Sequence, residues 1–145
     1  MDVQQLFSVR DKVVLVTGGS RGIGLMIAQG FVANGAKVYI SSRKAEVCDK
    51  VASELSQQGP GQCISIPADL QDLNQVNHLA ETLAHREPNG IHILVNNAGA
   101  NWAASVEEYS EQAFHKVMTL NLNHIFALIK RCLPLLVKAS TKQDP

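Results

Sequence analysis

Cysteine is scarce in this sequence, and its three cysteines, Cys48, Cys63 and Cys132, are far apart. An odd, widely spaced set matches neither a disulfide framework nor a zinc-binding pattern. The five histidines show no metal-ligand spacing with cysteine or carboxylate residues, so no metal site is expected. We therefore expect three reduced thiols, buried or half-buried. Such thiols favour a reducing compartment, that is, a cytoplasmic location.

An excess of charge of one sign is also lacking. The 13 basic and 13 acidic residues give a formal net charge of zero, and the basic residues are scattered along the chain. Nucleic acids and anionic membrane surfaces both bind clustered lysine and arginine side chains. We therefore expect no nucleic acid and no membrane surface among the partners.

Long hydrophobic runs are absent as well. No apolar run approaches the roughly 20 residues that a membrane span needs. Residues 1–5 (MDVQQ) lack the basic segment and the apolar core that a secretion signal would have. The chain of 145 residues, of which 46% are hydrophobic and 18% charged, is expected to form one globular domain.

The sequence does contain a regular alternation of two patterns. Short apolar runs rich in β-branched residues, typical of strands, alternate with segments whose apolar residues recur at helical spacing. The expected strands are residues 12–17, 37–41, 62–67 and 91–95. The expected helices are residues 22–34, 45–58, 73–85, 106–115 and 117–138, and a turn is expected at residues 87–90.

This alternation predicts an α/β fold. Strands that are apolar along their whole length are typical of parallel sheets with helices on both faces. Right-handed crossovers then favour a doubly wound, Rossmann-type sheet, here truncated after about four strands. The domain is expected to span residues 1–138, with residues 139–145 (ASTKQDP) as a polar tail.

A glycine-rich turn, residues 17–24 (TGGSRGIG), follows the first expected strand and opens the first expected helix. Gly18 allows a tight reversal of the chain, Gly22 allows the backbone to approach a ligand, and Gly24 allows the helix to pack closely on the strand. The helix points free N–H groups and a positive dipole end at the turn, which suits a pyrophosphate. The turn therefore predicts a dinucleotide site, although its spacing differs from the general G-x-G-x-x-G fingerprint. Plain packing of the turn is the alternative.

The end of the second strand indicates which dinucleotide binds. A carboxylate there would bind an adenosine 2′-hydroxyl, whereas an arginine favours a 2′-phosphate. Residues 41–44 (SSRK) contain no carboxylate, and Arg21 in the glycine turn can approach the same phosphate. We therefore expect NADP(H) rather than NAD(H). The alternative is that Arg43 and Lys44 only solvate the start of the next helix.

Polar residues also follow the third and fourth strands. Asp69 is placed to accept a hydrogen bond from the adenine amino group, to cap the next helix, or to do both. Residues 96–99 (NNAG) follow the fourth strand, at the sheet edge where open α/β sheets hold ligands. Small residues there allow a cofactor to approach closely, and the asparagine side chains can lock neighbouring strands.

These motifs, with Asn121 added, resemble the short-chain dehydrogenase/reductase family over the whole chain. The likeness is closer to the family's 3-oxoacyl-[acyl-carrier-protein] reductases, including those of rhamnolipid pathways. The resemblance implies an NADP(H)-dependent oxidoreductase with a small-molecule carbonyl substrate. It also implies that the full-length form is a dimer or tetramer, with the last long helix at a subunit interface. The implied coenzyme-binding residues are Gly18, Ser20, Arg21, Gly22, Ile23, Gly24, Ser42, Arg43, Asp69, Leu70, Asn97, Ala98 and Gly99.

The family has a catalytic set of Asn, Ser, Tyr and Lys. The resemblance identifies one member of that set in this sequence, Asn121. In the family this asparagine bends its helix and holds a water in a proton relay. The sequence departs from the family in lacking Tyr-x-x-x-Lys, because its two tyrosines, Tyr39 and Tyr109, are followed four residues later by Arg43 and Ala113.

Three hypotheses follow from this departure. The chain is the coenzyme-binding part of such an oxidoreductase, or it is a truncated protein that binds NADP(H) without catalysis. The third hypothesis, a nucleotide-sensing regulator, lacks a recognisable partner surface. A sheet that stops after the fourth strand would leave an open apolar edge, which favours self-association.

Overall fold

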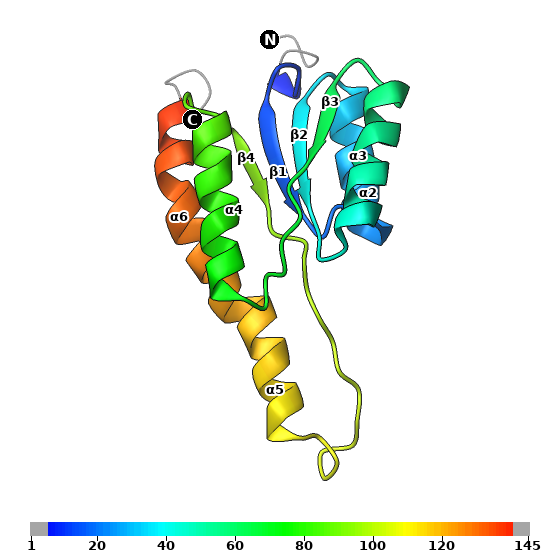
Figure 1. The fold of residues 1–145 in the computed structure, drawn as a ribbon, viewed down its shortest axis with the longest axis vertical. Coiled ribbons are helices and arrows are strands. Elements are labelled where there is room, and N and C mark those ends of the chain that lie inside the picture. Colours follow the sequence, from blue (N-terminus) through cyan, green and yellow to red (C-terminus); the bar gives the residue numbers. More distant parts are fainter. Residues whose placement is uncertain (1–5, 141–145) are drawn as a thin grey trace.

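The computed structural model describes residues 6–140. Its strands are β1 (Val13–Thr17), β2 (Lys37–Ser41), β3 (Gln62–Ser65) and β4 (Ile93–Val95). Its helices are α2 (Gly22–Ala33), α3 (Ala45–Gln58), α4 (Leu73–Arg86), α5 (Glu111–Met118), the π-helical turn η1 (Thr119–Asn123) and α6 (His124–Ala139). The strands form one parallel sheet in the order β3-β2-β1-β4, which confirms the doubly wound topology (Figure 1).

Helices cover both faces of the sheet, as the apolar strands predict. Successive side chains of a strand point to opposite faces, so Val14 and Val16 pack against α2 and α3 while Leu15 packs toward α4 and α6. Each face has its own hydrophobic cluster, and Figure 1 shows the two helix pairs on either side of the sheet. The double cover explains why β1 and β2 are buried almost from end to end.

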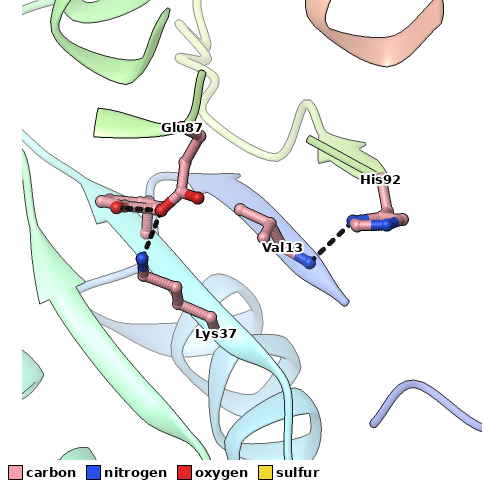
Figure 2. Close-up of polar contacts among 5 residues, drawn as sticks. Val13, Lys37, Glu87 and His92 are labelled. Carbon is pink, nitrogen blue, oxygen red and sulfur yellow. Dashed lines mark hydrogen bonds and ion pairs between the residues drawn. The ribbon is translucent and has the colours of Figure 1, made fainter. Parts of the chain in front are cut away.

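The predicted bounds of β2 and α3 are confirmed, and those of α2 and α4 differ by one residue at the C-terminal end. The fourth strand is shorter than predicted and begins at Ile93 rather than at residue 91. The reason lies in His92, whose N–H donates to the Val13 carbonyl at 2.8 Å. Its ring nitrogen Nδ1 accepts from the Val13 N–H at 3.0 Å, so a side chain takes the place of the next ladder bond (Figure 2).

The prediction of two separate helices at residues 106–115 and 117–138 is wrong. No helix begins at residue 106, because residues 101–110 are mostly exposed loop and α5 begins at Glu111. Ser110 caps α5, accepting from the Ala113 N–H at 3.1 Å. From Glu111 the helix continues without a break to Ala139, and the π-helical turn contains one extra residue that shifts the apolar stripe. Because the apolar residues change their helical phase there, the sequence pattern suggests two helices instead of one.

The polar tail predicted from residue 139 begins later. Ala139 still belongs to α6, and Ser140 is its C-cap. Residues 141–145 of that tail lie outside the described part of the chain, so the rest of the prediction is untested.

A buried carboxylate fixes the amino end of the sheet. Glu87 follows α4 in the predicted turn, which the hydrogen bond from the Gly90 N–H to the Glu87 carbonyl confirms. Its Oε1 accepts from the Tyr39 hydroxyl at 2.5 Å and pairs with Lys37 Nζ at 2.5 Å (Figure 2). Burial, and then the hydrogen bond to Glu87, raise the pKa of Tyr39 well above its usual value. The loop before β4 is thereby tied to β2.

His92 stands beside this cluster in the neutral form. Its Nδ1 accepts a hydrogen bond, so the ring hydrogen is on Nε2. Burial first, and then the positive charge of Lys12, lower the pKa of His92. The β1–β4 junction therefore favours an uncharged ring.

The three cysteines are free and buried, as predicted. Burial raises the pKa of Cys63 to about 12 and that of Cys132 to about 11. A thiol reacts as its thiolate, so these two side chains are unreactive core residues.

The helix Glu111–Ala139 contradicts the expectation that no segment approaches a membrane span. By length and composition alone it is long and apolar enough to cross a membrane. One side of α6, with Leu128, Cys132 and Leu135, belongs to the core. The other side presents exposed apolar residues, which are Phe126, Ile129, Leu133 and Val137.

Replacing Glu87 by alanine should lower the free energy of unfolding by about 2–3 kcal/mol, because the Tyr39 hydroxyl is left buried without a partner. Urea unfolding monitored by circular dichroism measures the change. Glu81→Ala, at an exposed position of α4, is the matched control and should change the stability by less than about 0.5 kcal/mol. Equal effects of the two substitutions would contradict the role assigned to Glu87.

Candidate functional site

A set of hydrogen bonds joins the carboxyl ends of β1 and β4. Thr17 Oγ1 donates to the Val95 carbonyl at 3.3 Å. The same oxygen accepts from the N–H groups of Asn97 at 3.1 Å and Ala98 at 3.0 Å. One buried hydroxyl thus holds the chain segment that leaves β4 against the last residue of β1.

Asn97 completes this junction from the other side. Its Nδ2 donates to the carbonyls of Thr17 at 3.0 Å and Gly18 at 3.3 Å. The prediction that an asparagine after the fourth strand locks neighbouring strands is confirmed for Asn97. Its neighbour Asn96 has a buried Oδ1 without a hydrogen-bond partner among residues 6–140.

The glycine turn depends on small residues at three positions. Gly18 has a φ of +67°, and its N–H donates to the Ser41 carbonyl at 2.8 Å, which ties the turn to the end of β2. A Cβ atom on Gly24 would overlap the Gly18 carbonyl, so α2 packs closely on the turn at Gly18, whereas close packing on the strand was predicted. Gly19 was not singled out from the sequence, yet a Cβ there would lie 2.6 Å from Ile40 Cγ2.

The amino end of α2 is open. A Cβ on Gly22 would meet no atom within 4 Å, and its φ of +55° is one that glycine adopts readily. Arg21, the N-cap residue, makes no side-chain hydrogen bond to the first turn, and that turn contains no acidic residue. The first N–H groups of a helix have no partner within it, so here they can bind an anion at the positive end of the helix dipole. Arg21 and Ile23 flank this end on the exposed surface.

The end of β2 places Ser42 and Arg43 beside the turn. Ser42 Oγ is shielded from solvent and has no hydrogen-bond partner in the described part of the chain. Arg43 is exposed, and Lys44 is the N-cap residue of α3. The anchor from Gly18 to Ser41 fixes this tip relative to α2.

The loop after β3 corrects one of the two roles considered for Asp69. The cap of α4 is Asp72, whose Oδ1 accepts from the Asn74 N–H at 2.8 Å and whose pKa is lowered chiefly by that bond. Asp69 instead closes its own loop, because its Oδ1 accepts from the Gln71 N–H at 3.0 Å. Asp69 and Leu70 are half-buried in this loop.

Asn121 lies in η1 and is bound to the loop after β4. Its Oδ1 accepts from the Ala100 N–H at 2.8 Å, and its Nδ2 donates to the Ala100 carbonyl at 2.7 Å. A Cβ on the neighbouring Gly99 would lie 3.3 Å from Asn121 Oδ1. The helix is irregular at Asn121, because η1 has π-helical geometry.

Two residues that sequence reasoning missed hold this helix to the loop after β3. His124 Nδ1 lies 2.6 Å from the Leu70 carbonyl, and Gln71 Nε2 donates to the Lys116 carbonyl at 3.0 Å. Neither residue lies in a recognisable motif, so the sequence held no signal for these contacts.

The candidate site is therefore an open surface at the carboxyl edge of the sheet. It joins the glycine turn, the tip of β2 and the loop after β4. A hollow of about 490 Å³, lined among others by Phe7, Lys12, His92 and Leu136, lies at the opposite, amino end of the strands. Among the described residues no group of three or more His, Cys, Asp or Glu side chains could hold a metal ion.

A family sequence model and individual relatives all match most of this chain. A sequence model of the short chain dehydrogenase family matches residues 12–143. The rhamnolipids biosynthesis 3-oxoacyl-[acyl-carrier-protein] reductase of Pseudomonas aeruginosa is 44% identical over 96% of this chain and 53% of its own length. A fatty acyl-CoA reductase of Acinetobacter baylyi is 34% identical over 94% of this chain and 46% of its own.

Solved structures agree. The RhlG/NADP active-site complex of Pseudomonas aeruginosa superposes with a TM-score of 0.90 at 44% identity, covering 96% of this chain and 53% of that one. A metagenomic short-chain oxidoreductase in complex with NADP gives a TM-score of 0.83 at 28% identity, covering 91% of this chain and 60% of that one. The chain spans about half the length of the curated relatives it matches.

Gly24→Ala should lower the free energy of unfolding by about 2 kcal/mol or more, because the new Cβ overlaps backbone that cannot move without breaking the turn. Gly30→Ala is the matched control on the same helix, where a Cβ meets nothing within 4 Å. It should raise the stability by about 0.5–1 kcal/mol. Thermal and urea unfolding of both variants measure the difference, and a harmless Gly24→Ala would refute the close approach of α2 to the turn.

Proposed function

Because the chain belongs to the short-chain dehydrogenase family, we propose that it is the coenzyme-binding part of an NADP(H)-dependent oxidoreductase that interconverts a carbonyl and an alcohol. The observation that carries the proposal is the open amino end of α2 beside the glycine turn. The Thr17 and Asn97 hydrogen bonds fix that turn relative to β4.

The carboxyl edge offers groups suited to each part of the coenzyme. Gly18, Ser20, Gly22, Ile23 and Gly24 surround the helix end that would hold the pyrophosphate. Arg21, Ser42 and Arg43 would bind the 2′-phosphate, which is a dianion that arginine holds with paired hydrogen bonds. Asp69 and Leu70 would hold the adenine. The coenzyme would pass close to the backbone of Asn97, Ala98 and Gly99.

When bound, NADPH would supply the hydride for carbonyl reduction. The proposed coenzyme-binding residues would place the coenzyme, and Asn121 holds the loop at Ala100. Asn121 is proposed as the one catalytic-set residue in this chain. Reduction also needs a proton donor, and neither tyrosine is followed by a lysine four residues later.

A 3-oxoacyl thioester is the substrate we propose. The support is the name of the 44% identical relative, a 3-oxoacyl-[acyl-carrier-protein] reductase, and that of the fatty acyl-CoA reductase. Both names refer to acyl groups joined to a carrier.

A second candidate function is binding of NADP(H) without catalysis. It is favoured by the missing Tyr-x-x-x-Lys. Reading the gene beyond the Pro145 codon separates the two. An in-frame continuation containing a serine strand and Tyr-x-x-x-Lys supports the oxidoreductase, and a stop codon supports the non-catalytic protein.

We further propose a homo-oligomer for the full-length form and a cytoplasmic location. The exposed apolar side of α6, with Phe126, Ile129, Leu133 and Val137, supports an interface. Three free, buried thiols support the cytoplasm.

The chain should bind NADPH more tightly than NADH, because only NADPH has the 2′-phosphate that Arg43 can reach. Arg43→Ala should weaken NADPH binding by about 10- to 100-fold and leave NADH binding unchanged. Lys50→Ala, an exposed cation on α3, is the matched control and should leave both affinities unchanged. Calorimetric titration measures them. Equal binding of the two coenzymes by the wild type would refute the coenzyme assignment.

The purified 145-residue chain should not oxidise NADPH in the presence of an acetoacetyl thioester, because it lacks a placed proton donor. The absorbance of NADPH at 340 nm, followed against a blank without protein, measures the rate. A full-length relative assayed in parallel verifies the substrate. Clear turnover by the chain would show that its own residues deliver the proton.

A further inference from the structure

The π-helical turn η1 (Thr119–Asn123) is held by hydrogen bonds to two loops. On one side, both polar atoms of the Asn121 side chain bind the backbone of Ala100, in the loop after β4. On the other side, the loop after β3 makes two bonds to the same helix. These are His124 Nδ1 to the Leu70 carbonyl at 2.6 Å and Gln71 Nε2 to the Lys116 carbonyl at 3.0 Å.

The two bonds from the loop after β3 flank the π-helical turn. Lys116 lies just before η1, and His124 is the first residue after it. A π-helical turn replaces i→i−4 bonds by i→i−5 bonds and is less favourable than regular helix, so it persists where neighbouring groups stabilise it. Two neighbouring side chains stabilise it here. Gln71 donates to the Lys116 carbonyl, and His124 bonds to the Leu70 carbonyl.

The His124 contact fixes the form of its ring. A backbone carbonyl can only accept, so Nδ1 must hold a hydrogen and donate it to the Leu70 oxygen. His124 is half-buried, and so is Leu70. His92 uses the opposite arrangement, in which Nδ1 accepts. His124 therefore acts as a directional link between a loop and a helix.

We propose that His124 is a positioning residue that couples the adenine-side loop, residues 69–72, to the turn that contains Asn121. The inference rests on the proposed function, because it assumes that Asp69 and Leu70 meet the coenzyme. Occupation of the loop then stiffens η1 through His124, and η1 holds Asn121 on Ala100. The coenzyme's adenine end is thereby linked to the catalytic-set residue without touching it.

Hydrogen–deuterium exchange of the 145-residue chain, with and without NADP⁺, tests the coupling. In the free protein, His124→Ala should speed the exchange of amides in residues 119–124 by about threefold to tenfold, the factor expected for one lost hydrogen bond. His124→Asn should restore slow exchange, because its Nδ2 occupies the place of Nδ1. His78→Ala, an exposed histidine on α4, should leave residues 119–124 unchanged.

With NADP⁺, peptides from the glycine turn should be protected in every variant. Residues 119–124 should gain protection in the wild type and in His124→Asn but not in His124→Ala. If His124 were only structural, its replacement by alanine would not change how much protection residues 119–124 gain when NADP⁺ is added. Equal gains of protection in the wild type and in His124→Ala would overturn the proposal.

The outcomes for the two proposals are separable. If NADP⁺ protects no peptide of the wild type, the proposed function fails, and with it the assumed path from the coenzyme. The positioning contact is then decided by the free protein alone. Faster exchange in His124→Ala that His124→Asn restores supports it, and unchanged exchange overturns it.

Discussion

Two side chains hold the candidate site together: the hydroxyl of Thr17 and the amide of Asn97. Where parallel strands end, the last carbonyl and N–H groups lose their ladder partners and need others. Thr17 satisfies N–H groups that follow β4, and Asn97 satisfies the carbonyls of Thr17, the last residue of β1, and of Gly18. The turn is therefore held in shape by the protein's own side chains, and no side chain caps the start of α2.

The polar groups at the two ends of the sheet differ in their hydrogen bonding. At the amino end, Glu87 ties the loop before β4 to β2 through Tyr39 and Lys37, and His92 continues the β1–β4 ladder with its ring. These groups are occupied with one another. At the carboxyl end, Thr17 and Asn97 satisfy backbone groups of the turn. Ser42 Oγ lacks a partner among residues 6–140, and the first turn of α2 has no side-chain cap. The groups left open for a ligand therefore lie at this end of the strands.

The parts that sequence predicts well are those with a local cause. The bounds of β2 and α3 follow from periodicity and from the turns beside them, and Gly18 and Gly24 are explained by backbone geometry within the turn. The parts that it misses depend on contacts distant in sequence. Asp69, the one residue predicted to cap the next helix, instead closes its own loop, and the structure has Asp72 as the N-cap of α4. The contact of His124 with Leu70 joins residues 54 positions apart and leaves no periodic trace.

The number of residues in the π-helical turn sets the orientation of α5 relative to α6. An α-helix turns by about 100° per residue, and η1 contains one residue more than a regular turn. Deleting any residue of Thr119–Asn123 would let the helix become regular and would rotate α5 by about 100° relative to α6. Substitutions there change single contacts, whereas a deletion would redirect the whole of α5 and the loop before it. Over evolutionary time the number of residues in this segment is thus expected to stay constant.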